Sequence, residues 1–393
     1  MDITKLEKQA DLLFQNVAGW ETFTLERMGK RIGKIGKMSL SDVKTLNNIA
    51  DVKGDIKAIQ KELARITGLN VSQISKIYGD VLADYHLQNK PLYDYRNKPF
   101  VPFKDNKELQ AIVKAYSKTT AETMVNLSKT KALAMIGNDG EVSGLQKAYT
   151  DVIDQATMQV ATGAEDFNSA MRGAIRNLGG SGIRIDYGGG ITRRLDTVVR
   201  QNLLWGAKQA SIEYAQMIGE ELGCDGIEVD WHSNPRPGHR FMQGKQFCNG
   251  KSRTINDVFF QGADEVDPKS EYGQTANQCL QEYGCLHFAT PIICGVSEPT
   301  YSETELARLK QEETRTYTVG NKTMDGYGWT QAMRKIETEI RKQKGIKVIA
   351  KASGDKKTVK DANERLKALN SKYNEITEAT GFPKETDRTR ITK

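Results

Sequence analysis

The chain has 393 residues, enough for two or three domains and a sizeable buried core. Its 38% hydrophobic and 27% charged residues are ordinary for a soluble protein. It has no run of about 18 apolar residues, so we expect no membrane span, and its first residues, MDITKLEKQADLLF, lack the basic and apolar regions of a secretory signal. Without such a signal, the five cysteines are expected to be thiols or metal ligands rather than disulfides.

The first 90 residues predict a helical N-terminal region. An apolar stripe runs from residue 52 to 66 in steps of four and three, with Gly68 placed to end the helix, and a second stripe follows from 74 to 85. Ser39 with Asp42 predicts the start of another short helix. Residues 91–106 contain three prolines and predict a linker or an extended arm.

Residues 107–178 return to a helical pattern. The segment GGSGIRIDYGGG, which begins at Gly179, alternates apolar residues between glycine clusters and predicts a short strand or hairpin. A long helix is expected from about Thr192 to Leu222, followed by the alternating strand GIEVDWH, which ends at His232. Residues 224–300 are rich in glycine, cysteine and aromatic residues, which favours short strands joined by long loops.

The C-terminal part is expected to be helical and basic. Ser302 and Glu305 predict a capping box at the start of a helix, and apolar residues from 359 to 376 form a seam that is expected to pack on a partner helix. We therefore predict an α+β protein in which helical regions flank an α+β domain. Its expected segments are 1–90, the linker 91–106, 107–178, the α+β domain 179–305, and the tail 306–393.

The positive charge is concentrated in this tail. Residues 331–393 contain 17 Lys+Arg and 9 Asp+Glu, a net charge of +8, while the remainder has a net charge of −1. Such a surplus can bind nucleic acid phosphates, although a solvated helical face is the simpler interpretation. The candidate DNA-binding residues are Lys342, Lys344, Lys347, Lys351, Lys356, Lys357 and Lys360.

Three of the four histidines and all five cysteines fall between positions 224 and 294. Imidazole and thiolate both suit Zn²⁺, so this window is a candidate for a structural zinc site or a catalytic metal. The spacing matches no zinc finger, and the favoured alternative is a core of buried cysteines and hydrogen-bonded histidines. The candidate metal ligands are His232, His239, Cys248, Cys285 and His287.

Acidic residues lie near His232 in the sequence. Glu228 and Asp230 share one side of the expected strand and Asp225 lies in the preceding turn, which suits an acid/base or metal pair and equally a solvated strand face. Arg236 lies between two prolines, and an internal salt bridge is expected for it rather than a bound anion. Signatures of common hydrolases and phosphate-binding loops do not occur.

Two segments carry a resemblance: the stretch from VVRQNLLWGAKQ to WHSNPRPGHRFMQGK, and YGCLHFATPIICGVSEPTYSETEL. Together they resemble the phage minor capsid protein 2 family, which is similar to the Mu F-like head morphogenesis proteins. The family pattern differs in having an aromatic residue at Met242 and an arginine at Leu286. The residues that match the pattern are Arg200, His232, Arg236, Pro237, His239, Gln243, Gly244, Cys285 and His287.

The resemblance implies a structural protein of the virion rather than an enzyme. It implies a minor head component at the portal vertex or in the capsid interior, made in the host cytoplasm and acting in capsid assembly or in DNA packaging or delivery. Its expected partners are the portal protein, other capsid or scaffolding proteins, and DNA through the basic tail. We expect portal contact through the helical regions. The alternatives are a metal-assisted hydrolase acting on nucleic acid and a DNA-binding accessory head protein.

Overall fold

The computed structural model describes residues 3–35, 48–127, 133–137, 140–162, 164–189 and 191–391. The chain forms two compact units, each assembled from three separate segments. Unit 1 contains Met1–Ala10, Ser72–Thr120 and Gln201–Gln331, and unit 2 contains Asp11–Val71, Ala121–Arg200 and Ala332–Lys393. The helices that contribute residues to both units are α1 (Ile3–Ile35), α3 (Asn48–Gln88), α5 (Lys107–Leu127), α8 (Leu195–Leu222) and α11 (Gly326–Ser353).

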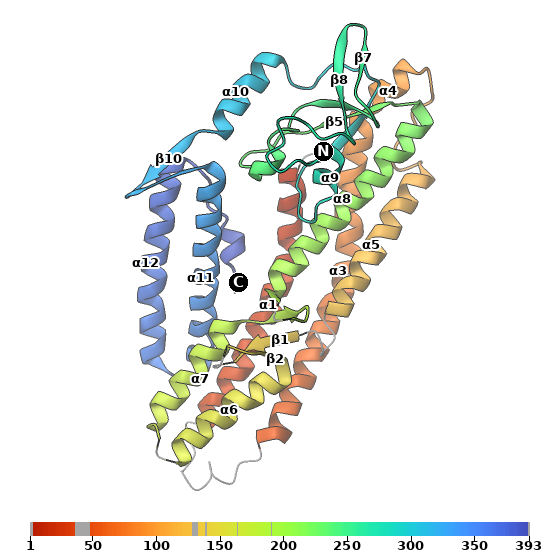
Figure 1. Cartoon of the computed structure of the whole chain (residues 1–393). Coiled ribbons are helices and arrows are strands. Elements are labelled where there is room, and N and C mark those ends of the chain that lie inside the picture. The colour runs from red at the N-terminus through yellow and green to blue at the C-terminus, as the bar shows by residue number, and fades with distance from the viewer. Residues whose placement is uncertain are drawn as a thin grey trace. The chain divides into compact units, whose positions relative to one another are not determined.

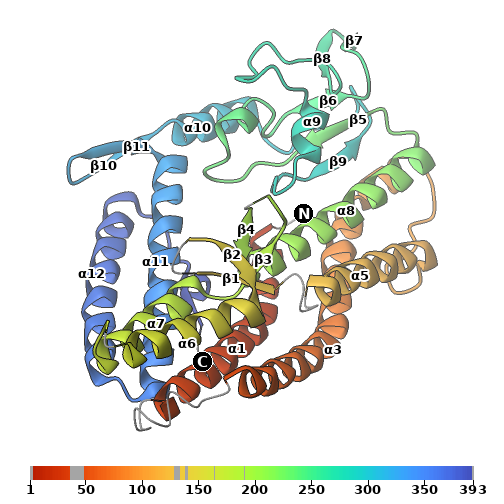
Figure 2. The same cartoon turned by 60° about the horizontal axis from the view of Figure 1, so that its bottom comes forward.

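Unit 2 combines helices with a small antiparallel sheet of order β2-β1-β3-β4 (Figure 2). Helices α6 and α7 pack against each other and against β1, and α11 runs beside α12 (Figure 1). The remaining elements of this unit are β1 (Leu133–Ile136), β2 (Val142–Gly144), α6 (Leu145–Ala161), α7 (Phe167–Ser181), β3 (Arg184–Asp186), β4 (Thr192–Arg194), α12 (Lys356–Thr380) and η2 (Thr386–Thr389).

Glycines allow the helices of unit 2 to approach α11 closely. A Cβ atom added to Gly179 of α7 would lie 2.6 Å from backbone atoms of Ile346, and one added to Gly29 of α1 would lie 2.5 Å from the carbonyl oxygen of Ile349. Real side chains cannot occupy such positions without moving the backbone. The packing of α1 and α7 on α11 therefore depends on glycine at these places.

Unit 1 contains a five-stranded sheet of order β7-β8-β6-β5-β9, in which β6 and β8 are parallel and the other neighbours antiparallel. Val229, Phe247, Met242 and Cys279 belong to the hydrophobic core beneath it. Its elements are α4 (Lys90–Tyr95), β5 (Gly226–Val229), η1 (Pro237–His239), β6 (Gln246–Cys248), β7 (Arg253–Ile255), β8 (Val258–Gly262), α9 (Ala276–Gln281), β9 (Ala289–Ile292), α10 (Glu303–Glu313), β10 (Thr316–Val319) and β11 (Lys322–Asp325).

Long-range polar contacts join the helices of unit 1. The buried ring of His86 bonds through Nδ1 to the Tyr214 hydroxyl at 2.8 Å and through Nε2 to the Val101 carbonyl oxygen at 2.8 Å, and it stacks on Phe100. This histidine lies outside the window 224–294. Its two ring nitrogens are satisfied by protein groups, so it serves the core of the unit.

Several predictions from local patterns are confirmed. The fold class is α+β, the segment after Gly179 forms the β3–β4 hairpin, and the long helix ends at Leu222 as expected. Two boundaries differ from the prediction: the strand ends at Val229, three residues before His232, and the long helix begins at Leu195 because Thr192–Arg194 forms β4. Ser302 caps α10 by accepting from the Glu305 N–H. The seam on α12 has its partner in α11, because the Tyr373 hydroxyl donates to Glu337 at 2.7 Å.

Other predictions are wrong. Gly68 does not end a helix, because α3 continues from Asn48 to Gln88; a glycine costs only about 1 kcal/mol in a helix interior, and the buried stripes on either side outweigh it. The expected helical region 107–178 also contains β1 and β2. The expected linker includes helix α4, and Tyr93 is buried in it. The helix start predicted at Ser39 lies outside the described residues.

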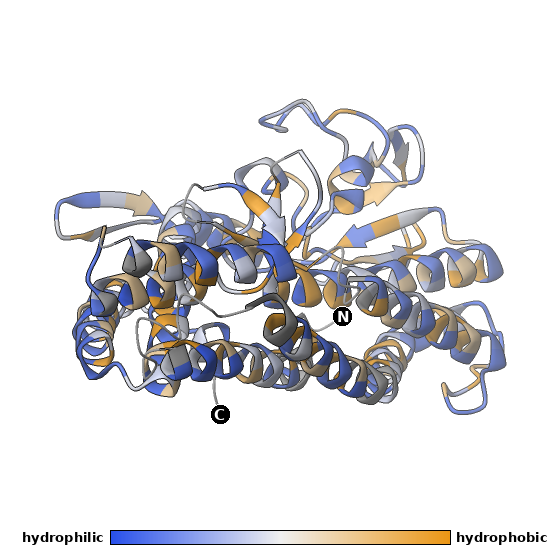
Figure 3. Cartoon of the chain, turned by 90° about the horizontal axis from the view of Figure 1, so that it is seen from below, coloured by the Kyte–Doolittle hydropathy of each residue, from blue (hydrophilic) through white to orange (hydrophobic). Residues whose placement is uncertain are grey.

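Hydrophobic and hydrophilic residues occur together along the long helices (Figure 3). This distribution is that of amphipathic helices with one face in a protein core. In the described part of the chain, no helix combines the length and the apolar character that crossing a bilayer requires.

Candidate functional site

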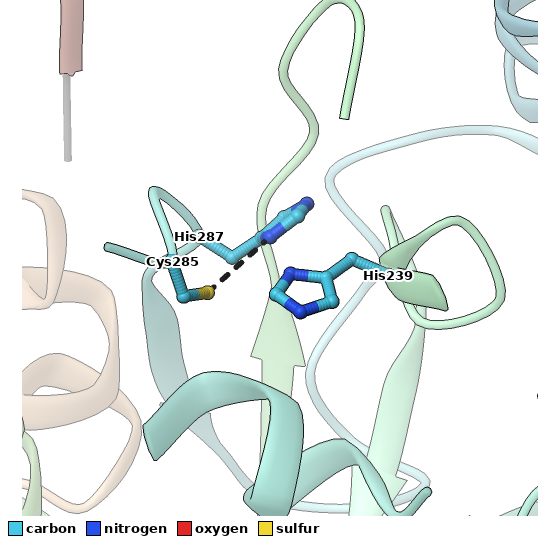
Figure 4. Close-up of side chains that lie close together, drawn as sticks. All are labelled: His239, Cys285 and His287. Carbon is cyan, nitrogen blue, oxygen red and sulfur yellow. Dashed lines mark hydrogen bonds between the residues drawn. The ribbon is translucent and has the colours of Figure 1, made fainter. Parts of the chain in front are cut away.

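His239, Cys285 and His287 come together in unit 1 (Figure 4). The short helix η1 ends at His239, the chain after α9 supplies Cys285, and His287 lies just before β9. One side-chain nitrogen or sulfur atom from each residue lies within 4.8 Å of the other two, and the residues are 3%, 5% and 0% exposed. Side chains from three segments therefore meet in a place that bulk water does not reach.

The hydrogen bonds of Gln243 determine which nitrogen of His287 carries its hydrogen. The backbone N–H of His232 donates to Oε1 of Gln243 at 3.0 Å, so this atom is the amide oxygen. Nε2 of His287 lies 2.8 Å from the same oxygen and must donate to it. The neutral ring then has its lone pair on Nδ1, which lies 3.6 Å from Sγ of Cys285.

Gln243 is held in turn by Glu313. Its amide nitrogen donates to the Glu313 carboxyl group, which also accepts from Nε1 of Trp231 at 2.7 Å. Burial raises the pKa of Glu313, although these two donors act against the rise. The chain of contacts from Trp231 to Cys285 is thus continuous and mostly buried.

The tautomer of His239 follows from Glu282. Nε2 of His239 lies 3.0 Å from Oε2 of Glu282, which also accepts from Arg236 at 3.1 Å. Burial would raise the pKa of Glu282, but its donors, Gln274 first among them, lower it below the ordinary value. Glu282 is therefore a carboxylate that accepts from Nε2 of His239. The internal salt bridge predicted for Arg236 is confirmed.

Cys285 and His239 influence each other electrostatically. Burial alone would lower the pKa of His239, but Cys285 and Glu282 raise it. Burial alone would raise the pKa of the Cys285 thiol, but His239 and Lys208 lower it. Lys208 is itself buried, which lowers its pKa, and it donates to the Cys285 carbonyl oxygen at 3.3 Å. Burial also lowers the pKa of His287 well below its usual value.

The other two proposed ligands are not part of this group. The ring of His232 lies beside that of His287, with centroids 4.2 Å apart and planes tilted by 40°, and its Nδ1 contacts the Ser233 carbonyl oxygen. Cys248 belongs to a different core cluster, where its sulfur lies 3.6 Å from that of Cys294. Because successive side chains of a strand point to opposite faces, Cys248 is on the other side of β6 from Phe247, which packs in the core near the histidines.

The three acids near His232 bind backbone groups. Asp225 accepts from the Cys294 N–H at 2.7 Å, Glu228 from the Thr300 N–H at 3.1 Å, and Asp230 from the Phe288 N–H at 2.7 Å. Burial raises the pKa of Asp230 to about 7. Within the described residues, these carboxylates do not belong to the group formed by His239, Cys285 and His287. By accepting from backbone N–H groups, these carboxylates hold the neighbouring loops and strands in position.

Three further residues of the family pattern support the fold and are not part of the group formed by His239, Cys285 and His287. Pro237 begins η1. Gly244 has a φ of +65°, which favours glycine, and a Cβ atom there would lie 2.4 Å from Cδ2 of Leu306, so the leucine side chain would have to move. Arg200 is buried in unit 2, where its charge acts on Glu337.

The tail lysines differ in exposure. Lys344 is partly buried, which lowers its pKa, and donates to the Thr389 carbonyl oxygen at 2.6 Å. Lys342 lies 3.9 Å from Glu339, and Lys347 is partly buried. The exposed members surround the turn between α11 and α12: Lys351, Lys356, Lys357 and Lys360.

Lys208, Glu282 and Glu313 were not predicted from the sequence. Glutamate and lysine are frequent and usually exposed, so neither residue type marks a site on its own. Glu282 offered a weak signal, since it lies three residues before Cys285. Glu313 offered none, since it is 70 residues from the glutamine that it binds.

Comparison with known proteins assigns the chain to a family. No curated protein and no solved structure matches it significantly. The family model described as phage minor capsid protein 2 matches residues 4–377, which is nearly the whole chain and includes the window of histidines and cysteines. The chain therefore belongs to the phage minor capsid protein 2 family, a family of phage structural proteins.

Proposed function

We propose that this chain is a structural component of the phage head that docks on the portal protein or a neighbouring capsid or scaffolding protein. The observation that carries the proposal is the chain of hydrogen bonds from Trp231 through Glu313, Gln243 and His287 to Cys285. Polar groups that bind one another in this way position the fold rather than a substrate. A role in a virion component is accordingly favoured over a hydrolase.

The surface that we assign to this contact is the β7–β8 hairpin, in place of the helical regions that the sequence suggested. Val258 and Phe259 of β8 are 53% and 64% exposed, and they pair with Ile255 and Thr254 of β7, the edge strand of the sheet. Exposed aliphatic and aromatic side chains next to a sheet edge are typical of protein–protein contacts. The turn before them, at Asn256 and Asp257, has positive φ angles and is held by Asn256 donating to the Gly295 carbonyl oxygen.

The test replaces both exposed side chains. We expect Val258→Thr with Phe259→Ser to retain the wild-type melting temperature but to reduce portal pull-down and the copies per virion counted by mass spectrometry. Met158→Gln is the control, because Met158 on α6 is 65% exposed and apolar but lies on another surface element. Undiminished portal binding and virion incorporation by the double variant would contradict the assignment.

A second role, in DNA contact, is supported by the exposed lysines at the α11–α12 turn. Four ammonium groups can each neutralise a phosphate, and each contact adds about 0.9 to the slope of log affinity against log salt. Replacing Lys351, Lys356, Lys357 and Lys360 with glutamine should therefore flatten that slope and weaken DNA binding at low salt. The control is the same replacement at exposed lysines of α3: Lys53, Lys57, Lys61 and Lys76. Equal losses in both variants would argue against a site at the turn.

A further inference from the structure

The group formed by His239, Cys285 and His287 has more lone pairs than hydrogens. The contacts of Nε2 with Glu282 and with Gln243 place the lone pair of each neutral ring on Nδ1. A ring nitrogen of each histidine and the Cys285 sulfur lie within 4.8 Å of one another, and Nδ1 is the nitrogen of His239 that is not bonded to Glu282. While both rings are neutral, one thiol hydrogen can serve only one of the two nitrogens, so hydrogen bonding within the group leaves an acceptor without a donor.

We propose that these three atoms bind Zn²⁺: Nδ1 of His239, Sγ of Cys285 and Nδ1 of His287. A cation satisfies all three lone pairs at once, and the mixture of imidazole and thiolate is one that zinc prefers. The thiol hydrogen leaves as a proton when the ion binds.

The distances fit a tetrahedral ion. Zinc lies about 2.3 Å from thiolate sulfur and about 2.1 Å from imidazole nitrogen, and a tetrahedral angle then places these atoms about 3.6 Å apart. Sγ of Cys285 and Nδ1 of His287 are 3.6 Å apart. His239 completes the group, since one of its ring nitrogens lies within 4.8 Å of the ligand atoms of the other two residues.

The surrounding residues resemble the outer shell of a metal site. Metal-bound histidines usually donate their second ring hydrogen to a carboxylate or a carbonyl oxygen, which fixes the tautomer and the ring orientation. Here His239 donates to the Glu282 carboxylate and His287 to the Gln243 amide oxygen. Glu282 and Gln243 are themselves held by Arg236 and Glu313.

The ion would act on stability. It would link the end of η1 to the segment between α9 and β9, which lies more than 40 residues further along the chain. Within the described chain, the group supplies three protein ligands, which leaves one position of a tetrahedron for a small ligand such as water. The burial of the three ligands keeps substrates away, which assigns the ion a structural role.

The test measures metal in the untagged full-length protein. We expect about one zinc per chain after purification, and a lower melting temperature after treatment with a chelator. X-ray absorption of the wild-type zinc protein should show one sulfur and otherwise nitrogen or oxygen ligands. Zinc at background in folded protein that also takes up none on titration overturns the proposal, as does a ligand shell without sulfur or with several sulfurs.

Variants assign the ligands. Cys285→Ser should lose zinc, whereas Cys248→Ser, which replaces a buried cysteine of the other cluster, should retain it. If Cys285→Ser does not fold, the wild-type and Cys248→Ser proteins are loaded with Co²⁺ and their absorption spectra are compared. A thiolate-to-cobalt band in both spectra supports Cys285 as the thiolate ligand, and loss of the band in Cys248→Ser contradicts the proposal.

Discussion

The contacts that stabilise unit 1 internally differ in kind from those that stabilise unit 2 internally. Unit 1 places a continuous set of hydrogen-bonded polar side chains beside a small sheet, whereas unit 2 brings helices together at glycines. Polar contacts are directional and specify one arrangement, while backbone approach depends on the absence of side-chain atoms. Substitutions that alter a side chain by a similar amount should therefore lower the free energy of unfolding to different extents in the two units.

Unit 2 also contains buried charge. Arg194 donates to Glu21 at 2.7 Å, and both side chains are less than a tenth exposed. Arg341 pairs with Asp196, whose Oδ1 lies 3.6 Å from Nε of Arg194, and burial lowers the pKa of Arg341 to about 10. Removing one partner of such a pair leaves a buried charge uncompensated. Packing and charge thus reinforce each other around α11.

The largest effect is expected for Gly179→Ala. The new methyl group would lie 2.6 Å from two backbone atoms of Ile346, so α7 and α11 must separate. We expect a loss of about 3 kcal/mol in the free energy of unfolding, the upper part of the range for overpacking. Urea denaturation measures the loss, and hydrogen exchange should show that it is concentrated in unit 2.

Gly173→Ala is the matched control, because Gly173 lies on the same helix and a Cβ atom added to it would have no neighbouring atom within 4 Å. This variant should gain about 0.5–1 kcal/mol from helix propensity alone. Equal effects of the two substitutions would show that close approach to α11 does not govern unit 2.

A smaller effect, centred on unit 1, is expected for Gln243→Leu. The substitution keeps the volume but removes the acceptor for the His232 N–H and for Nε2 of His287. Buried donors without partners cost about 2 kcal/mol. Increased hydrogen exchange should appear around β5 and β9 and leave α11 unchanged, whereas Gln281→Leu, at an exposed position, should change stability by less than about 0.5 kcal/mol. Exchange that rises equally in both units would show that they do not unfold separately.

The sequence predicted what depends on local pattern. Apolar periodicity identified the stripes of α3 and α12, and glycine clusters identified the β3–β4 hairpin. The division into two units could not be predicted from local patterns, because each unit joins three segments that are distant in the sequence. One contact that joins such segments is the hydrogen bond from the Tyr78 hydroxyl to the Leu203 carbonyl oxygen, 125 residues away. A protein that lacked residues 1–90 would for this reason lose core residues of both units and could not be used to test portal contact by the N-terminal helices.

The candidate site was predictable to the extent that its residue types are rare. His239, Cys285 and His287 could be selected because the chain has few histidines and cysteines. Cys248 was selected by the same criterion, yet the strand β6 turns it toward Cys294. The orientation of a ring depends on which group its second nitrogen meets, and that is decided by tertiary contacts such as the one between His239 and Glu282.

The smallest effect is a pH dependence in unit 2. Burial raises the pKa of Glu337 above its ordinary value of 4.5, although Arg334 and the hydroxyl of Tyr373 act against the rise. The unfolded chain therefore loses this proton at a lower pH than the folded chain does. The contribution of Glu337 is fully present below about pH 4.5 and is lost as the pH rises through the folded pKa.

Glu337→Gln should remove this part of the pH dependence. The amide oxygen can still accept from Tyr373, which lies 2.7 Å from the present carboxylate, but it does not titrate. Urea denaturation from about pH 4.5 to about pH 8 should show a smaller decline in unfolding free energy for the variant than for wild type. Glu339→Gln, at an exposed position on the same helix, should retain the wild-type decline. A variant whose stability falls as steeply as that of wild type would mean that Glu337 is already ionised at the acidic end, and that the charge of Arg334 outweighs burial at this position.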